Sequence, residues 1–179
     1  QLNLLNLSLD YNNDIPFEIK KILNQFRSKY KDNVLRILIH LPSPLLSPGG
    51  YSVFINIYES LVFMGVKTDL YNWNDDFESK FNQFKPNVFI TSDDINYINR
   101  INWSYIKKYK KNNNLRVGLT ASIAEYGNTP INTRISWAID NNVDFYYSFR
   151  AKEYTDSRKE YQPFFDSKSQ IVQCYIQRL

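Results

Sequence analysis

The sequence predicts an α/β fold: a single doubly wound, mostly parallel sheet of five to six strands with helices on both faces, of the Rossmann-like type. Two observations carry this prediction. Short β-branched apolar segments alternate with segments of helical periodicity at intervals of about 25–35 residues, which is the pattern of repeated β-α-β units. The segment 34–42 (VLRILIHLP) is apolar almost throughout, as expected for a strand that is buried on both faces in the middle of a parallel sheet.

The other predicted strands are also short, and turn signals such as Gly65, Pro86 and the asparagines at 112–114 flank several of them. Pro42 ends the first strand, since proline cannot donate a backbone hydrogen bond to a neighbouring strand. Strands are predicted at 34–42, 66–73, 87–92, 115–121 and 143–149, with a sixth short strand within 170–176.

Helices are predicted between these strands from the spacing of apolar residues. In the segment after the first strand, Val53, Ile57 and Leu61 recur every three or four residues, and Gly65 stands where a helix would stop. In 74–84, Asp75 and Glu78 have the spacing of a capping box. Helices are predicted at 13–33, 51–65, 74–84, 95–111, 130–142 and 151–161.

Length and composition indicate one globular domain. The chain has 179 residues, 43% of them hydrophobic and 22% charged, which fits a single domain of ordinary size. We divide the domain, 1–179, into an N-terminal extension and helix (1–33), a core (34–150) and a C-terminal helix and short strand (151–179). No apolar run reaches the roughly 18 residues of a membrane span, and the first residues lack a signal peptide's pattern, so we expect a cytoplasmic location.

Residue counts exclude several kinds of chemistry. The chain has one cysteine, Cys174, and one histidine, His40. An internal disulfide framework, a cysteine-based zinc site and a multi-histidine metal site are therefore excluded, and we expect no metal. Nothing in the sequence requires a cofactor.

The charge balance permits an anionic partner without requiring one. Lys and Arg number 22 against 18 Asp and Glu, a net charge of +4 with a pI near 9.0. A run of lysines, Lys107, Lys108, Lys110 and Lys111, ends a predicted helix. It is either a solvated face that the helix dipole stabilises or a contact for anionic lipid head groups, which would place the protein at the periphery of a membrane. Nucleic acid is not expected, because recognisable basic–aromatic motifs are absent.

Ligands of open parallel sheets bind beyond the carboxyl ends of the strands, so the loops there supply the candidate site. After the first strand, Gly49 and Gly50 lead into a helix whose first amides could face an anion; the alternative is a simple tight turn. His40 ends that strand beside the glycine pair. It is a candidate base or acceptor contact, and its structural alternative is a satisfied core residue.

Two further loops carry polar candidates. Ser92 and Asp93 follow the third strand and could bind a hydroxyl-rich ligand; the alternative, which we favour, is that Asp93 or Asp94 caps the next helix. Thr120 and Ser122 follow the fourth strand and could contact a sugar or phosphate, or serve only the loop.

These segments resemble a known family. The stretch ILIHLPSPLLSPGGYSVFINIYESLVFMGVKTDLYNW, with FKPNVFITSDD, LRVGLTAS and VDFYYSF after it, resembles the N-terminal, acceptor-side Rossmann-like domain of GT-B glycosyltransferases over about residues 34–150. The resemblance implies transfer of a sugar from a nucleotide-sugar donor to an acceptor hydroxyl, with the glycine pair near the donor diphosphate.

The resemblance also sets a limit on activity. That family's second domain supplies most donor contacts, and this chain is too short to include it. We therefore expect part of a transferase that is inactive as this fragment. The alternative is a non-catalytic Rossmann-like module that binds a ligand or a protein, because no convincing acid–base pair is visible.

Overall fold

Strands and helices alternate along the chain as the sequence predicts. The computed structural model describes residues 35–41, 48–72, 74–94, 98–120, 130–148, 159–167 and 174–175. The described elements are β1 (Arg36–Leu41), α3 (Pro48–Phe63), β2 (Lys67–Asn72), α4 (Phe77–Phe84), β3 (Val88–Ser92), α6 (Trp103–Asn112), β4 (Arg116–Thr120), α7 (Ile131–Asp140), β5 (Phe145–Ser148), the 3₁₀ turn η1 (Lys159–Tyr161), α9 (Gln162–Asp166) and β6 (Cys174–Tyr175).

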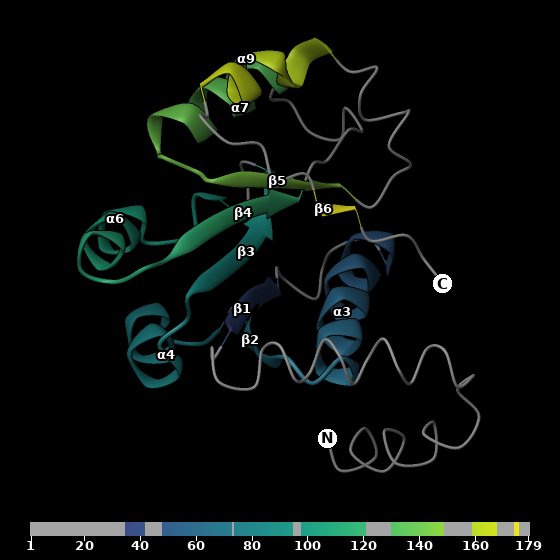
Figure 1. The fold of residues 1–179 in the computed structure, drawn as a ribbon, viewed down its shortest axis with the longest axis vertical. Coiled ribbons are helices and arrows are strands. Elements are labelled where there is room, and N and C mark those ends of the chain that lie inside the picture. Colours follow the sequence, from purple (N-terminus) through teal and green to yellow (C-terminus); the bar gives the residue numbers. More distant parts are fainter. Residues whose placement is uncertain are drawn as a thin grey trace.

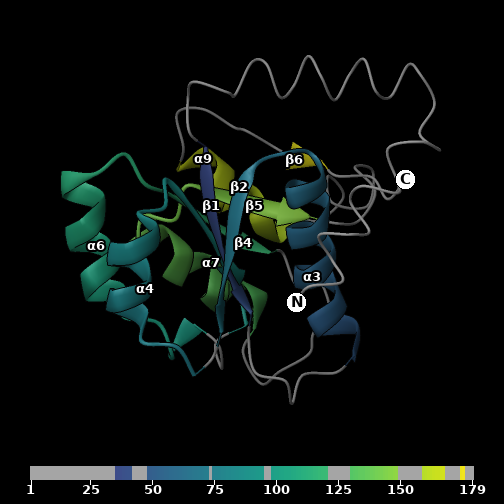
Figure 2. The same ribbon diagram turned by 90° about the horizontal axis from the view of Figure 1, so that it is seen from below.

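The strands form one sheet in which every neighbouring pair is parallel, in the order β2-β1-β3-β4-β5-β6. Helix α3 covers one face of the sheet, and α4, α6, α7 and α9 cover the other (Figures 1 and 2). The predicted fold class is thus confirmed. The order runs outward from β1 in both directions, which is one of the two common orders of doubly wound folds.

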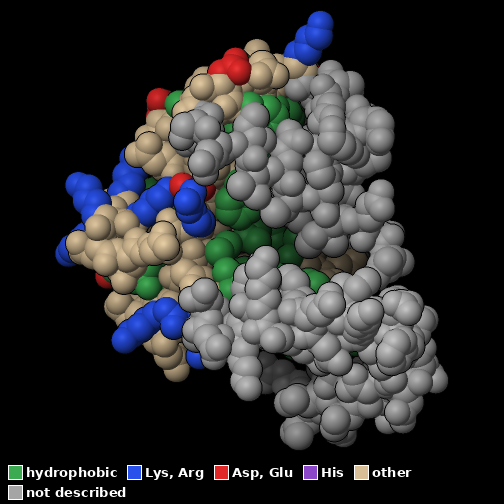
Figure 3. Space-filling view, viewed as in Figure 1, with side chains coloured by type: hydrophobic (Ala, Val, Ile, Leu, Met, Phe, Trp, Pro, Cys, Tyr) green, Lys and Arg blue, Asp and Glu red, His purple; other side chains and the backbone are tan. Residues whose placement is uncertain are grey.

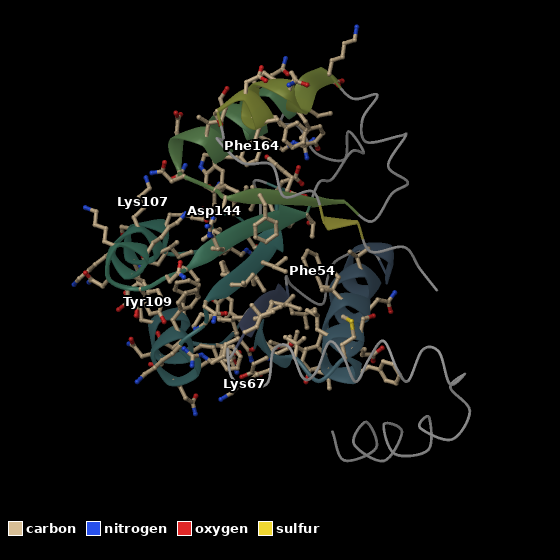
Figure 4. The ribbon with its side chains drawn as sticks, viewed as in Figure 1. Phe54, Lys67, Lys107, Tyr109, Asp144 and Phe164 are labelled. Carbon is tan, nitrogen blue, oxygen red and sulfur yellow. The ribbon has the colours of Figure 1, made fainter. Side chains whose placement is uncertain are left out.

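Burial on both faces of the sheet explains the apolar composition of its central strands. Leu38 and Ile39 are consecutive residues of β1, point to opposite faces, and are both fully buried. Leu38 belongs to the core beneath α4 and α6, where Phe81 and Phe89 meet edge to face. Ile39 belongs to the core beneath α3, toward which Phe54 points (Figure 4).

Two helix starts differ from the prediction. Helix α3 begins at Pro48 rather than at residue 51, so Gly49 and Gly50 lie in its first turn and not in the preceding loop. Proline is favoured at this position because the first helical amide needs no partner. In α4 the cap is Asp76, whose carboxylate accepts a hydrogen bond from the Ser79 amide, while Asp75 accepts from the Asn72 amide instead.

The end of α3 follows the prediction. Gly65 has a φ of 79°, in the left-handed region that glycine adopts without strain. The Val66 amide then donates to the Leu61 carbonyl at 2.9 Å, which closes the helix as in a Schellman motif.

The predicted helix 95–111 is interrupted. Asn102 ends a turn that includes Ile98, and its side chain accepts a hydrogen bond from the Tyr105 amide, so a separate helix, α6, begins at Trp103. A side chain that caps a helix competes with helix continuation at the same position, and the apolar periodicity concealed this break.

The ends of the chain are described only in part. Near the C-terminus, η1 and α9 extend past the predicted helix 151–161 to Asp166, and the two described residues of the predicted sixth strand form β6. Residues 1–33, with their predicted helix, and residues 151–158 lie outside the described ranges.

Gly118 in β4 allows an aromatic ring to lie on the sheet. A Cβ atom at this position would overlap the ring of Phe145, its register partner on β5. We expect Gly118→Ala to lower the free energy of unfolding by about 1–3 kcal/mol, the usual cost of overpacking. Urea denaturation measures this loss. The double variant with Phe145→Leu should recover part of it, and a Gly118→Ala protein as stable as the parent would contradict the packing described.

Candidate functional site

The parallel strands all end at one edge of the sheet, called here the carboxyl edge. Strands β2 and β3 lie on opposite sides of β1, so the direction of winding reverses between β1 and β3. In sheets of this order, ligands bind beyond the strand ends where the winding reverses, because the loops there diverge to opposite faces. The candidate residues at the ends of β1, β3 and β4 therefore lie at this edge.

The start of helix α3 is the first feature of the edge. The helix begins after β1 and carries no acidic residue in its first turn. Backbone amides of a first turn have no partner within the helix, and the dipole makes this end positive. Gly49 and Gly50 add no side chain in front of these amides. The local geometry is therefore compatible with an anion.

His40 lies in the interior rather than at an open surface. It is 1% exposed, and its Nδ1 atom shares a hydrogen bond of 2.8 Å with the Thr91 hydroxyl of β3. Its ring also packs on Tyr71 of β2, with ring centroids 5.0 Å apart. Burial, with the positive charge of Arg100 as a smaller cause, lowers the pKa of His40 from 6.5 to about 4. The imidazole is consequently neutral at physiological pH.

Asp93 forms a buried ion pair. Its carboxylate Oδ2 lies 3.1 Å from Nη1 of Arg134 on α7, and the two side chains are 1% and 4% exposed. The sequence predicted either a ligand contact or a helix cap for Asp93. The ion pair with Arg134 is neither of these. Two buried charges that satisfy each other fix α7 against the end of β3, because separating them inside the protein is costly.

Tyr146 of β5 lies near this ion pair. It is 7% exposed and packs edge to face on Tyr161 and Phe164, at centroid distances of 5.1 and 4.7 Å. Burial raises the pKa of Tyr146 well above its usual value, and the charge of Asp93 adds to this effect. Among the described residues its hydroxyl has no hydrogen-bond partner. The phenol is thus a neutral group beside the Asp93 carboxylate.

Ser92 and Thr120 lie on the opposite face of the sheet from Thr91 and Asp93. They are register partners on β3 and β4, and both are buried. The Ser92 hydroxyl accepts a hydrogen bond of 3.0 Å from the Asp94 amide, a local turn contact. Ser122, the remaining candidate, lies outside the described residues.

The structure thus divides the candidates into two groups by sheet face. His40 and Asp93 lie on the face beneath α4, α6 and α7, whereas Ser92 and Thr120 lie on the face beneath α3. The glycine pair lies at the start of α3, which covers the second of these faces.

Sequence reasoning missed the partners of the two buried groups. Thr91 shares a hydrogen bond with His40, and Arg134 donates a hydrogen bond to Asp93. A signal for Arg134 existed: it stands at the helical spacing of Ile131, Ile135 and Ala138, the buried face of α7, where an arginine needs a buried acid. No comparable signal marked Thr91, which is one of many hydroxyl residues.

Neither a metal-binding cluster nor a membrane-spanning helix is found within the described ranges. There, no three of His, Cys, Asp and Glu stand close enough together to hold a metal ion. No described helix combines the length and apolarity that crossing a membrane requires. Comparison of the chain with protein-family models, curated proteins and solved structures gives no match.

The neutral state of buried His40 makes stability depend on pH. The unfolded chain takes up a proton below a pH of about 6.5, while the folded protein resists it until about 4. Stability due to His40 is therefore complete above 6.5 and is lost as the pH falls toward 4, by up to about 3 kcal/mol.

Urea denaturation of the parent and of His40→Gln across this pH range tests the prediction. The carboxylates titrate alike in both proteins, so the difference between the two pH profiles of stability isolates the effect of the imidazole. The loss of stability on acidification should be shallower in His40→Gln. Equal slopes would show that burial does not hold the imidazole neutral.

The ion pair between Asp93 and Arg134 gives a second prediction. Asp93→Asn leaves a buried guanidinium without its carboxylate, and we expect a loss of about 3–5 kcal/mol in the free energy of unfolding. The double variant Asp93→Asn with Arg134→Met removes the stranded charge, so it should be more stable than Asp93→Asn alone. Additive losses in thermal or urea denaturation would show that the pair does not interact.

Proposed function

We propose that this domain binds the phosphate-bearing part of a nucleotide sugar at the carboxyl edge, as the acceptor-side half of a GT-B-type glycosyltransferase. The observation that supports this proposal most is the position of helix α3. It begins beyond β1, where the winding reverses, and places Gly49 and Gly50 in its first turn. A diphosphate needs closely approachable amides and a positive helix end, and both are available there.

The reaction would be transfer of a glycosyl group from the donor to an acceptor hydroxyl. In this proposal the first-turn amides of α3 stabilise the negative charge that grows on the leaving diphosphate as the glycosidic bond breaks. The loops after β3 and β4 orient the acceptor. The remaining donor contacts belong to a second domain, so we expect these 179 residues to bind a nucleotide sugar without turnover.

The buried side chains take a supporting part. His40 is neutral, is 1% exposed and is bonded to Thr91, so we do not assign it the role of general base. The pair Asp93–Arg134 holds the end of β3 against α7. These contacts keep the strand ends rigid, which is what a preorganised binding edge requires.

A second function is favoured by a different observation. Three of the polar candidates, His40, Ser92 and Asp93, each bond to another group of the domain. This would suit a non-catalytic module that binds a small ligand or a protein through its backbone and loops.

A matched pair of variants at Gly50 tests the proposal. Gly50→Asp places a negative charge in the first turn of α3, whereas Gly50→Asn adds a side chain of the same size without charge. We expect Gly50→Asp to bind UDP-glucose or GDP-mannose about five- to tenfold more weakly than Gly50→Asn, because the added charge repels the diphosphate.

Calorimetric or NMR titration of the whole chain measures these affinities. Both side chains are compatible with a helix start, so a difference in folding is not expected, and circular dichroism verifies it. Equal affinities of the two variants would show that the diphosphate does not bind at the start of this helix. Absence of binding to a panel of nucleotide sugars by the parent chain would favour the non-catalytic module.

A further inference from the structure

The opposite edge of the sheet, where the strands begin, gathers positive charge; it is called here the amino edge. Arg36 is the first residue of β1 and lies in register beside Lys67, the first residue of β2. Arg116 is the first residue of β4. Lys85 follows α4, and its carbonyl accepts a hydrogen bond of 2.6 Å from Nε of Arg36. Three cationic side chains therefore stand at the starts of strands, and a fourth, Lys85, stands at the end of α4 beside them.

Helix α6 extends this charge over an adjoining face. Lys107, Lys108 and Lys111 are exposed on the side opposite its buried residue Ile106, and Lys107 points away from the molecule (Figure 4). In the space-filling view, blue side chains gather over α6 and α4 with few red ones among them (Figure 3). The basic surface consists of Arg36, Lys67, Lys85, Lys107, Lys108, Lys111 and Arg116.

Few acidic side chains offset these charges. Asp144 lies between α6 and the sheet and is already held by Lys110 at 2.5 Å and, more weakly, by Arg116 at 4.0 Å. Asp140 stands at the end of α7, and Asp69 of β2 is held by Lys80 at 2.7 Å. Arg116 keeps 67% of its side chain exposed despite its contact with Asp144. The surface consequently retains a positive charge toward solvent.

Helix dipoles account for only part of the pattern. Lys111 stands in the last turn of α6 and Lys85 follows α4, where cations stabilise the negative helix ends. Arg36, Lys67 and Arg116 begin strands instead, where no such dipole acts on them from their own element. An anionic partner would account for these residues together with the exposed lysines.

The aromatic side chains near the surface help to distinguish two anionic partners, single-stranded nucleic acid and lipid head groups. Trp103 packs on Trp137 at 4.7 Å, Tyr109 packs on Phe81 at 5.3 Å, and Tyr105 bonds to Asn82. Each of these rings already has a partner in the fold, which favours lipid over single-stranded nucleic acid, whose bases stack on free aromatic rings. Lipid head groups require only positive charge at the surface.

We propose that the basic surface holds the protein on a membrane rich in anionic lipid. Among the described residues the one exposed large hydrophobic side chain is Val62, which lies on α3 and not on this surface. Attachment through the described residues is therefore electrostatic, reversible and sensitive to salt, because this surface offers no exposed large apolar side chain among them. It turns the carboxyl edge away from the lipid and does not depend on the function proposed for that edge.

Vesicle sedimentation tests the proposal. The whole chain is mixed with phosphatidylcholine vesicles, with or without about one third phosphatidylserine, at about 0.05 M and about 0.3 M NaCl. We expect binding only to the anionic vesicles, and mainly at the lower salt. Lys108→Gln with Lys111→Gln should weaken this binding about thirtyfold, while Lys108→Arg with Lys111→Arg should leave it unchanged.

A control with the same change in net charge shows whether vesicle binding depends on where the charges lie or only on the net charge. Asn132→Glu with Thr133→Glu also lowers the net charge by two, but at exposed positions in the first turn of α7, on the carboxyl edge. This control should keep most of the vesicle binding. Equal losses in the two charge-reduced proteins, no binding to anionic vesicles, or tighter binding to a nucleic-acid oligonucleotide at the same salt would overturn the proposal.

Discussion

Burial of the central strands on both faces is the constraint on which the rest of this structure depends. Every second residue of β1 and β3 faces one helical layer and the others face the opposite layer. Apolar side chains satisfy this arrangement without further partners. Any polar side chain in these strands must instead find its partner inside the protein, since an unsatisfied buried group costs stability.

The carboxyl edge shows how that requirement is met. His40 finds Thr91 on the neighbouring strand, and Asp93 finds Arg134 on a helix that is distant in sequence. Both contacts take reactive-looking side chains out of contact with solvent, and burial lowers the pKa of His40 so that it stays neutral. The polar candidates thus stabilise the strand ends, and the ligand contact that we propose falls to the amides at the start of α3.

The direction of the helices gives the domain two different edges. In a parallel α/β sheet the helices return antiparallel to the strands, so helix starts meet the carboxyl edge and helix ends meet the amino edge. Helix starts favour anions and helix ends favour cations. The amino edge of this protein carries more positive charge than the helix ends require, which is why we assign it a partner of its own.

The sequence by itself determined the fold class and the order of the elements. Periodicity is a local property, so the alternation of short apolar segments with helical segments, together with the apolar run of β1, was sufficient to predict a doubly wound sheet. The sequence predicted the ends of helices less reliably. Asn102 interrupts a periodic segment, and α3 begins before the glycine pair.

Only the tertiary structure decided which polar residues are paired. Asp93 and Arg134 are separated by 41 residues, and His40 and Thr91 by 51. Their contacts depend on strand register and on where α7 lies on the sheet, neither of which is encoded within a short segment. The same reason explains the amino edge: Arg36, Lys85 and Arg116 are scattered along the chain, and parallel pairing alone brings them to one surface.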